Sequence, residues 1–368
     1  MKIAIDARLY GVENKGIGRY TQELVNNLQT QDKENNYFIL LRKKYFNKLK
    51  LANNFRMIQT EYRHYSISEQ IRLPLLLNKI KPDIFHALNT NVPLIYSGRL
   101  VVTVHDMTQL DFNRKATTLP IPFYAIKNLA YRDLFRSSVS KASAIIVPSE
   151  FVKADLLDLF GISVNKIVVI PEGVSSQFRK PSQAKRSIGD YLVYVGSSYP
   201  HKNLHLLIAA VNMLNKQKKK PIKLKLIVGN DYFSRRLASQ VSKEQFSFVE
   251  FVSQVTDSNL RLIYRDSLAF VFPSLSEGFG LPGLEAMATG ALVACSNIPT
   301  FKEVYGDNAI YFDPRSDQSL ADTILKILKM SSAKRAKRIK KSQGYVKQFA
   351  WSKTARKTLE VYNSIQTL

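Results

Sequence analysis

The chain has 368 residues, of which 45% are hydrophobic and 11% aromatic, and this excludes disorder of the whole chain. Its 54 lysines and arginines outnumber 29 acidic residues, for a net charge of +25. This excess indicates a polyanionic partner, such as a nucleic acid, an anionic membrane or a phosphorylated substrate. A single cysteine cannot form an internal disulfide, and we find no apolar run long enough to span a bilayer. We therefore expect a cytoplasmic protein.

Short apolar runs alternate with segments of helical period along the chain, as in an α/β fold with parallel sheets. In the first half, strands are predicted over 2–5, 37–41, 83–86, 100–104, 144–148 and 166–170, with helices over 20–29 and 152–160 among others. A second series of strands is predicted over 191–195, 224–228, 248–251, 268–272, 291–294 and 310–312. A further helix is expected over 345–365.

A polar, turn-rich stretch separates the two series. We predict an N-terminal domain over 1–173, a linker over 174–190, a second domain over 191–345, and a C-terminal helix over 346–368 that crosses back towards the first domain. Ligands of open α/β sheets bind beyond the carboxyl ends of the strands, so each domain is expected to offer half of a shared site.

The segment 273–290 combines glycines with two glutamates. Glu277 precedes a glycine-rich turn, a helix is predicted to open near Pro282, and Glu285 follows one turn later. Glycines let backbone N–H groups approach a ligand, and a helix N-terminus favours a phosphate. The glycines alone leave two interpretations open: a ligand site, or an ordinary strand–helix turn with two solvated glutamates.

The spacing of Glu277 and Glu285 resembles the E-x7-E motif of retaining glycosyltransferases of family 4, which have the GT-B fold. Further segments resemble the family in the same order along the chain: 16–20, 147–150, 170–174, 194–196, 200–203, 270–314 and 349–354. The resemblance extends from residue 3 to about 365. It implies two doubly wound, Rossmann-like domains facing across a cleft, the first for the acceptor and the second for a nucleotide sugar.

The resemblance also implies roles for individual residues. Lys202 is expected to bind the donor diphosphate, Glu285 the ribose, and Glu277 to lie beside the donor sugar, where His105 would also contact a hydroxyl group. We expect Lys202, Glu277 and His105 to be the catalytic residues. The other donor-binding residues are predicted to be Gly16 and Gly18 in a loop that closes over the phosphates, Gly196, Ser197, Gly278, Phe279, Gly280 and Leu281 near the diphosphate and sugar, and Gly229 and Val255 near the base.

The sequence departs from the family at one position of this site. Many members carry arginine directly after the glycine at Gly196, whereas this chain has Ser197, so more of the phosphate charge would fall to Lys202. Similar variants with Pro200, His201 and Lys202 occur in a subgroup that builds mannose- or rhamnose-containing surface polysaccharides. This favours GDP-mannose as the donor.

Ligands for a metal ion are not evident in the sequence. It has no Asp-x-Asp pair, one cysteine and five histidines without metal-ligand spacing. We therefore expect no metal and no cofactor, with Lys202, the loop amides and a helix dipole stabilising the leaving group.

The segment 42–56 has six basic residues and no acid, interleaved with apolar and aromatic residues. Two interpretations stay open for it: a contact with an anionic membrane on the inner face of the cell membrane, or a solvated face beside a core strand.

The favoured function is a metal-independent, retaining transfer of a hexose from a nucleotide sugar to a lipid-linked or oligosaccharide acceptor in cell-surface polysaccharide biosynthesis. A sugar-nucleotide epimerase of the same fold and a basic nucleic-acid-binding protein are the alternatives. A nucleic-acid binder would need base-stacking aromatics on a basic sheet or a groove-reading helix, and neither pattern is found.

Overall fold

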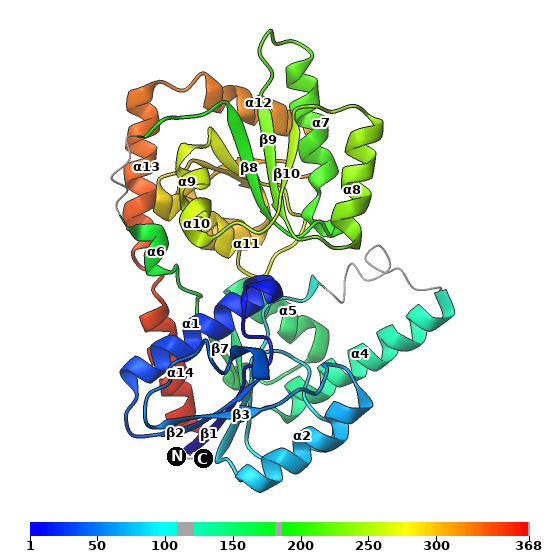
Figure 1. Cartoon of the computed structure of the whole chain (residues 1–368), viewed down its shortest axis with the longest axis vertical. Coiled ribbons are helices and arrows are strands. Elements are labelled where there is room, and N and C mark those ends of the chain that lie inside the picture. The colour runs from blue at the N-terminus through cyan, green and yellow to red at the C-terminus, as the bar shows by residue number, and fades with distance from the viewer. Residues whose placement is uncertain (109–120, 181–185, 367–368) are drawn as a thin grey trace. The chain divides into compact units, whose positions relative to one another are not determined.

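A computed structural model describes residues 1–108, 121–180 and 186–366 of the chain (Figure 1). The chain divides into two compact units. The first unit comprises Met1–Gly173 and Ala350–Leu368, and the second comprises Val174–Phe349. None of the helices within the described ranges is both long and apolar enough to span a membrane.

The first unit contains a seven-stranded parallel sheet. Its strands lie in the order β3 (Phe55–Gln59), β2 (Asn36–Leu41), β1 (Lys2–Asp6), β4 (Ile84–Ala87), β5 (Leu100–Thr103), β6 (Ala144–Val147) and β7 (Ile167–Val169). All of these strands except β3 were predicted from the sequence. β3 is an edge strand whose Arg56 and Gln59 are exposed, so it lacks the continuous apolar run of its neighbours.

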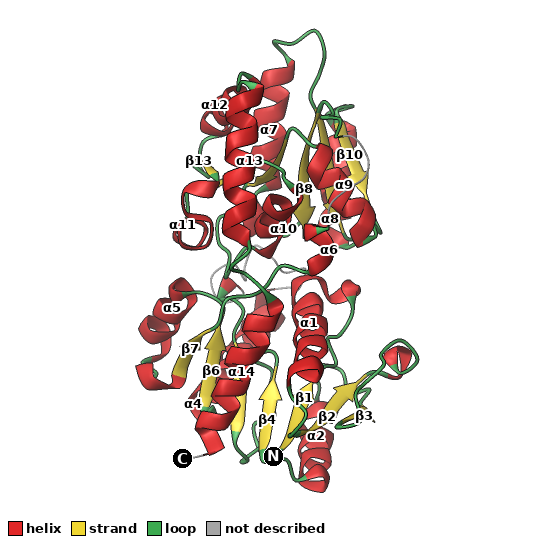
Figure 2. Ribbon diagram, turned by 90° about the vertical axis from the view of Figure 1, so that its left-hand side faces the viewer, coloured by secondary structure: helices red, strands yellow, loops and turns green. Residues whose placement is uncertain are grey.

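Helices cover both faces of this sheet. The helices α1 (Lys15–Gln31) and α14 (Trp351–Gln366) lie side by side over one face (Figure 2). On the other face, α2 (Ile67–Ile80), α4 (Ile121–Lys141) and α5 (Glu150–Phe160) bury Leu73, Phe135 and Leu156 in one core with the strands. Burial of such side chains is the main driving force that holds the layers together.

The second unit contains a six-stranded parallel sheet in the order β10 (Val249–Val252), β9 (Lys223–Val228), β8 (Tyr191–Gly196), β11 (Ala269–Phe272), β12 (Val293–Ser296) and β13 (Ile310–Phe312). Its helices are α6 (Ser176–Arg179), α7 (Leu204–Asn215), α8 (Tyr232–Lys243), α9 (Asp257–Asp266), α10 (Leu281–Thr289), α11 (Pro299–Tyr305), α12 (Asp317–Leu328) and α13 (Ser332–Val346). Both sheets are doubly wound, as expected from the sequence.

Two segments differ from the sequence-based expectation. The stretch 174–190 was expected to be a linker, but its described part belongs to the second unit, where α6 packs against α9 and α10. The helix expected over 345–365 is interrupted, because α13 ends at Val346 and α14 begins at Trp351. The second of the two boundaries between the units, after Phe349, falls within this interruption.

Candidate active site

The strand order of the second sheet reverses between β8 and β11, and ligands of open α/β sheets bind at such points. The loop after β8 contains the 3-10 turn η4 (Pro200–Lys202), and the loop after β11 contains Ser274 and Glu277. The backbone N–H of Leu275 donates to the His201 carbonyl at 2.8 Å. The two loops are therefore joined directly, and their side chains are held at one edge of the sheet.

Lys202 and Glu277 are in direct contact at this edge. Lys202 Nζ lies 2.7 Å from Glu277 Oε1, and Ser274 Oγ donates to the same oxygen at 2.7 Å. The Thr300 hydroxyl, at the start of α11, donates to the backbone carbonyl of Glu277 at 2.7 Å. The Lys202 and Glu277 side chains are only 16% and 12% exposed. The ammonium and the carboxylate predicted to bind the donor are thus brought together and held in place.

Glycine is required at the start of α10 for steric reasons. Gly280, the residue before the helix, has a φ of +96°, a left-handed conformation that side chains rarely adopt. A Cβ at this position would lie 2.3 Å from the Tyr305 hydroxyl, which donates to the Gly280 carbonyl. With Pro282 in its first turn, α10 opens where the sequence predicted. Pro282 has no N–H and the Gly283 N–H donates to the Gly280 carbonyl at 3.1 Å, so this helix start offers a ligand the positive end of its dipole more than free donors.

The E-x7-E glutamates are not solvated. Glu285 is 4% exposed within α10, so the interpretation of 273–290 as a turn with two solvated glutamates is wrong. Phe279 and Leu281 are 5% and 6% exposed, and Phe279 packs edge-on against Phe349 with ring centroids 6.0 Å apart. Gly278 and Phe279 therefore contribute backbone to the turn, while the phenylalanine ring packs into the core.

The other predicted donor-binding residues of the second unit lie at the same edge. Gly196 ends β8, and Ser197 follows it, 7% exposed, with its carbonyl accepting a hydrogen bond from Tyr194 at 2.7 Å. Gly229 directly follows β9 and is exposed, and Val255 lies half-buried in the loop after β10. Their contacts with a nucleotide stay a prediction.

Gly16 and Gly18 are not in a loop, contrary to our expectation. They lie in the first turn of α1, directly after the 3-10 turn η1 (Val12–Asn14). Gly18 is buried, and a Cβ there would lie 1.9 Å from the Gly11 carbonyl oxygen, whereas a Cβ at Gly16 would meet open space. Close packing of the preceding turn against the helix therefore explains Gly18.

His105 follows β5 in the first unit, and three strand ends meet around it. Its Nδ1 lies 3.3 Å from Glu172 Oε1, after β7, and its Nε2 lies 3.1 Å from the Leu88 carbonyl oxygen, after β4. Tyr20 packs edge-on against the ring, with centroids 4.6 Å apart. No role was predicted for Glu172, although it lies within the family-like segment 170–174.

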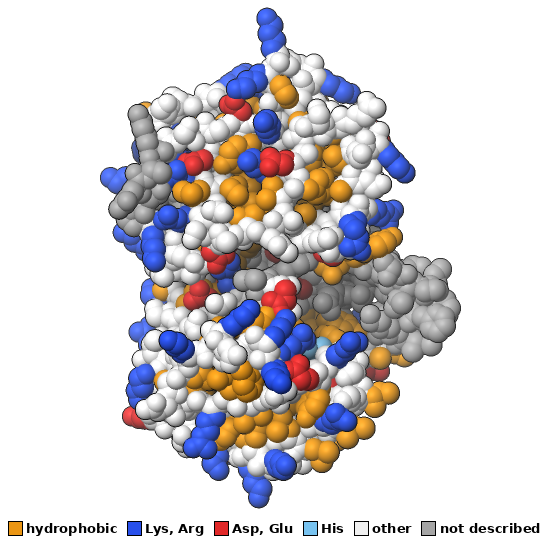
Figure 3. All heavy atoms as spheres, in the orientation of Figure 1, with side chains coloured by type: hydrophobic (Ala, Val, Ile, Leu, Met, Phe, Trp, Pro, Cys, Tyr) orange, Lys and Arg blue, Asp and Glu red, His pale blue; other side chains and the backbone are white. Residues whose placement is uncertain are grey.

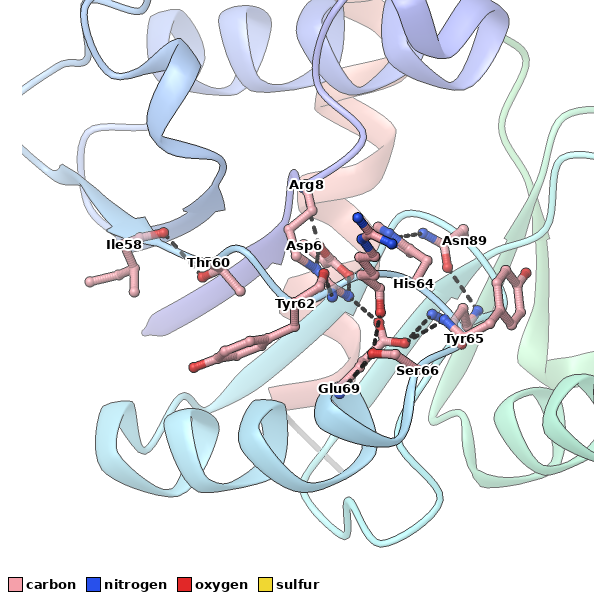
Figure 4. A network of polar contacts seen from close by, with 12 residues as sticks. Asp6, Arg8, Ile58, Thr60, Tyr62, His64, Tyr65, Ser66, Glu69 and Asn89 are labelled. Carbon is pink, nitrogen blue, oxygen red and sulfur yellow. Dashed lines mark hydrogen bonds and ion pairs between the residues drawn. The ribbon is translucent and has the colours of Figure 1, made fainter. Parts of the chain in front are cut away.

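A buried ionic network that was not predicted lies at the carboxyl end of β1 (Figure 4). Arg8 Nη2 lies 2.5 Å from Asp6 Oδ2 and 2.6 Å from Glu69 Oε1, and all three side chains are fully buried. Burial by itself raises the pKa of the Asp6 carboxyl, but Arg8 outweighs this effect and holds that pKa below its ordinary value. The side chain of Glu69 also accepts from Asn91 at 2.7 Å, so the network joins β1, α2 and the loop after β4.

The basic segment 42–56 presents charge but little apolar surface. Tyr45, Leu49 and Phe55 are 6%, 7% and 5% exposed, whereas Lys43, Lys44 and other basic side chains point outwards. These three apolar residues belong to the core of the first unit, and Phe46 and Leu51 are half-buried. The structure therefore favours the interpretation as a solvated face beside a core strand.

Comparison with known protein families decides to which family this chain belongs. The profile of the family described as Glycosyltransferase Family 4 matches residues 14–178, and that of Glycosyl transferases group 1 matches residues 175–344. This chain belongs to the family 4 glycosyltransferases.

Two curated proteins illustrate the relationship of this glycosyltransferase to others. It is 31% identical over 242 residues to the O-antigen chain mannosyltransferase RfbU of Salmonella typhimurium, covering 64% of this chain and 66% of that protein. It is 26% identical over 380 residues to the O-antigen chain mannosyltransferase B of Escherichia coli, covering 94% and 95% of the two chains.

The fold of the glycosyltransferase is GT-B. The sucrose-phosphate synthase of Thermosynechococcus elongatus has the same fold, with a TM-score of 0.78, 19% identity, and coverage of 100% of this chain and 99% of that one. This agrees with the fold class predicted from the sequence.

Proposed function

We propose that this glycosyltransferase transfers mannose from GDP-mannose, with retention of the anomeric configuration, to a lipid-linked or oligosaccharide acceptor in cell-surface polysaccharide biosynthesis. Two relatives are named O-antigen chain mannosyltransferases, which supports mannose as the sugar. The segment from Ser197 to Lys202, with serine where many family members have arginine, supports the mannosyltransferase-like subgroup.

The contact between Lys202 and Glu277 carries this proposal. In a nucleotide sugar a single oxygen joins the anomeric carbon to the terminal phosphorus. A cation for the phosphate and a polar group for the sugar must therefore be neighbours, and the 2.7 Å between Nζ and Oε1 meets this requirement. The positive end of the α10 dipole would add to the stabilisation of the diphosphate, where negative charge develops as the nucleotide leaves.

The same contact bears on the reaction mechanism. A double displacement needs a carboxylate on the face of the sugar opposite the leaving group. Glu277 is bonded to Lys202, the proposed partner of the leaving phosphate, and so would lie on the leaving-group side. We therefore propose front-face attack: the acceptor oxygen bonds to the anomeric carbon, the bond to GDP breaks, and the departing phosphate takes the proton of the acceptor hydroxyl.

Calorimetric binding to a panel of GDP-, UDP- and dTDP-sugars tests the donor, and the anomeric configuration of the transferred sugar, read by NMR, tests retention. We expect GDP-mannose to bind most tightly and the mannosidic linkage to keep the donor configuration. Preference for a UDP- or dTDP-sugar would overturn the donor assignment, and an inverted linkage would overturn the mechanism. Release of an epimerised nucleotide sugar without acceptor would favour the epimerase instead.

A further inference from the structure

Helix α2 carries apolar side chains on two opposite faces. Leu73 and Leu77 are buried in the core of the first unit, as expected for a helix that covers a sheet. Ile67, Ile71 and Leu75, spaced four residues apart on the other face, are 80%, 54% and 62% exposed. Single exposed hydrophobic residues are common, but a row of three along one helix requires an explanation.

A neighbouring loop extends this row. Leu94 and Ile95, in the loop between β4 and β5, are 45% and 70% exposed. The backbone N–H of Leu94 donates to the side chain of Gln70 in α2 at 2.8 Å, which fixes the loop beside the helix. We call Ile67, Ile71, Leu75, Leu94 and Ile95 together the α2 face. Figure 3 shows hydrophobic side chains gathered over α2, with lysines and arginines around them.

Positive charge surrounds the α2 face. Arg72 and Lys79 are exposed on α2, and α4, which covers the same side of the sheet, exposes Arg132, Arg136 and Lys141 against one acid, Asp133, over 132–141. Lys141 Nζ donates to the Leu94 carbonyl, so the end of α4 adjoins the loop. The single acid of α2 is Glu69, which is fully buried against Arg8. No negative charge of α2 therefore faces outwards.

We propose that the α2 face is the surface by which this glycosyltransferase binds an anionic lipid bilayer. The isoleucines and leucines would enter the boundary of the acyl chains while the cations bind the lipid phosphates. A second copy of the chain fits less well, because a twofold contact through this face would place arginines and lysines against each other. This inference rests on the proposed function and deepens it, because an enzyme that uses a lipid-linked acceptor must work at a membrane surface.

Co-sedimentation of the full chain with vesicles tests this surface. Vesicles of phosphatidylcholine alone are compared with equimolar phosphatidylcholine and phosphatidylglycerol, without nucleotide sugar or acceptor. We expect binding to the anionic vesicles only, weakened by added salt. Ile71→Ser/Leu75→Ser removes apolar contact, and Arg132→Glu/Arg136→Glu reverses charge. Each double variant should lower the partition coefficient by about tenfold or more.

Matched controls lie elsewhere on the surface. Leu159→Ser/Val164→Ser replaces two residues of the first unit with similar exposure, 44% and 51%, and Lys218→Glu/Lys219→Glu makes the same change of charge in the second unit. Both controls should bind vesicles like the parent chain, and thermal unfolding monitored by circular dichroism verifies that every variant is folded.

Equal loss of vesicle binding in the α2-face variants and in their controls would overturn the proposal, as would equal binding to neutral and anionic vesicles. A dimer that dissociates in Ile71→Ser/Leu75→Ser, seen by sedimentation velocity without lipid, would assign the surface to a second copy. If the protein does not bind anionic vesicles but still transfers mannose from GDP-mannose to a soluble acceptor, the membrane surface is contradicted and the proposed function is not. If the protein binds anionic vesicles but transfers no sugar from GDP-mannose, the proposed donor is contradicted and the membrane surface is not.

Discussion

Lys202 and Glu277 are 75 positions apart in the sequence, yet the ammonium of one lies 2.7 Å from the carboxylate of the other. The reversal of strand order between β8 and β11 produces this contact, because it places the loops after both strands side by side. One group is proposed for the phosphate and the other for the sugar, so replacing each should affect a different step.

Replacing Lys202 by methionine should weaken donor binding. Loss of a charged contact to the diphosphate costs about 1.5–3 kcal/mol, or roughly ten- to a hundred-fold in Kd. Titration calorimetry with GDP and GDP-mannose measures this change. Lys302→Met, at an exposed lysine of α11, is the matched control and should bind both ligands normally. Unchanged affinity in a folded Lys202→Met variant would remove Lys202 from the site.

Replacing Glu277 by glutamine should lower kcat more than it raises the Kd for the donor. The amide oxygen can still accept from Ser274, but the negative charge beside the sugar is lost, and this charge should matter most in the transition state. Steady-state kinetics and calorimetry on the same preparation separate the two effects. A higher Kd with unchanged kcat would show that Glu277 only binds the donor.

Glu285 should discriminate between ribose and deoxyribose. If its buried carboxylate accepts from the ribose hydroxyls, wild-type protein should bind GDP more tightly than its 2′-deoxy or 3′-deoxy analogue. Glu285→Met should bind all three with similar, weaker affinity, because the acceptor is gone and the side-chain volume is similar. Persistent discrimination in Glu285→Met would place the ribose elsewhere.

The elements near the site were predictable from the sequence to different degrees. Buried parallel strands such as β8 and β11 are continuous apolar runs, and their positions were right to within one or two residues. Glu277 and Glu285 were identified through a motif that is contiguous in the sequence. The distant partners of this turn were not, because Thr300 and Tyr305 reach the carbonyls of Glu277 and Gly280 only when α11 folds back beside it. The start of α1 was misjudged because glycine signals a loop, whereas Gly18 serves close packing within a helix.

The Asp6–Arg8–Glu69 network should be essential for the first unit. Arg8→Met would leave two buried carboxylates without their cation, and breaking such a buried pair costs about 3–5 kcal/mol. Trp351 is the single tryptophan and belongs to the first unit, so its fluorescence during urea unfolding reports on this unit. Arg42→Met, at a half-buried arginine outside the network, is the control. Equal unfolding midpoints for both variants would contradict the assigned role.

His86 should make the stability of the first unit sensitive to acid. The ring is fully buried, with Nδ1 2.6 Å from the Tyr362 hydroxyl and Nε2 2.9 Å from the Thr103 hydroxyl. Burial, together with the charge of His105, lowers the pKa of His86 to about 3.

An unfolded histidine has a pKa of about 6.5, so between pH 6.5 and pH 3 the unfolded chain binds a proton at His86 that the folded chain does not. The free energy of unfolding should therefore fall as the pH is lowered through this range. The contribution of His86 alone is about 2 kcal/mol between pH 6.5 and pH 5, at 1.36 kcal/mol per pH unit. Urea unfolding followed by Trp351 fluorescence at several pH values measures it.

The His86→Gln variant keeps an amide donor and acceptor. Its free energy of unfolding should depend less steeply on pH, by the equivalent of about one proton. Part of the slope should persist, because burial also lowers the pKa of His64, in the same unit, to about 4. His205→Gln lies in the second unit and should leave the Trp351 curve unchanged at every pH, although the pKa of His205 is lowered by burial as well. Identical pH slopes for wild-type protein and His86→Gln would show that His86 is not the buried neutral base that its contacts with Thr103 and Tyr362 indicate.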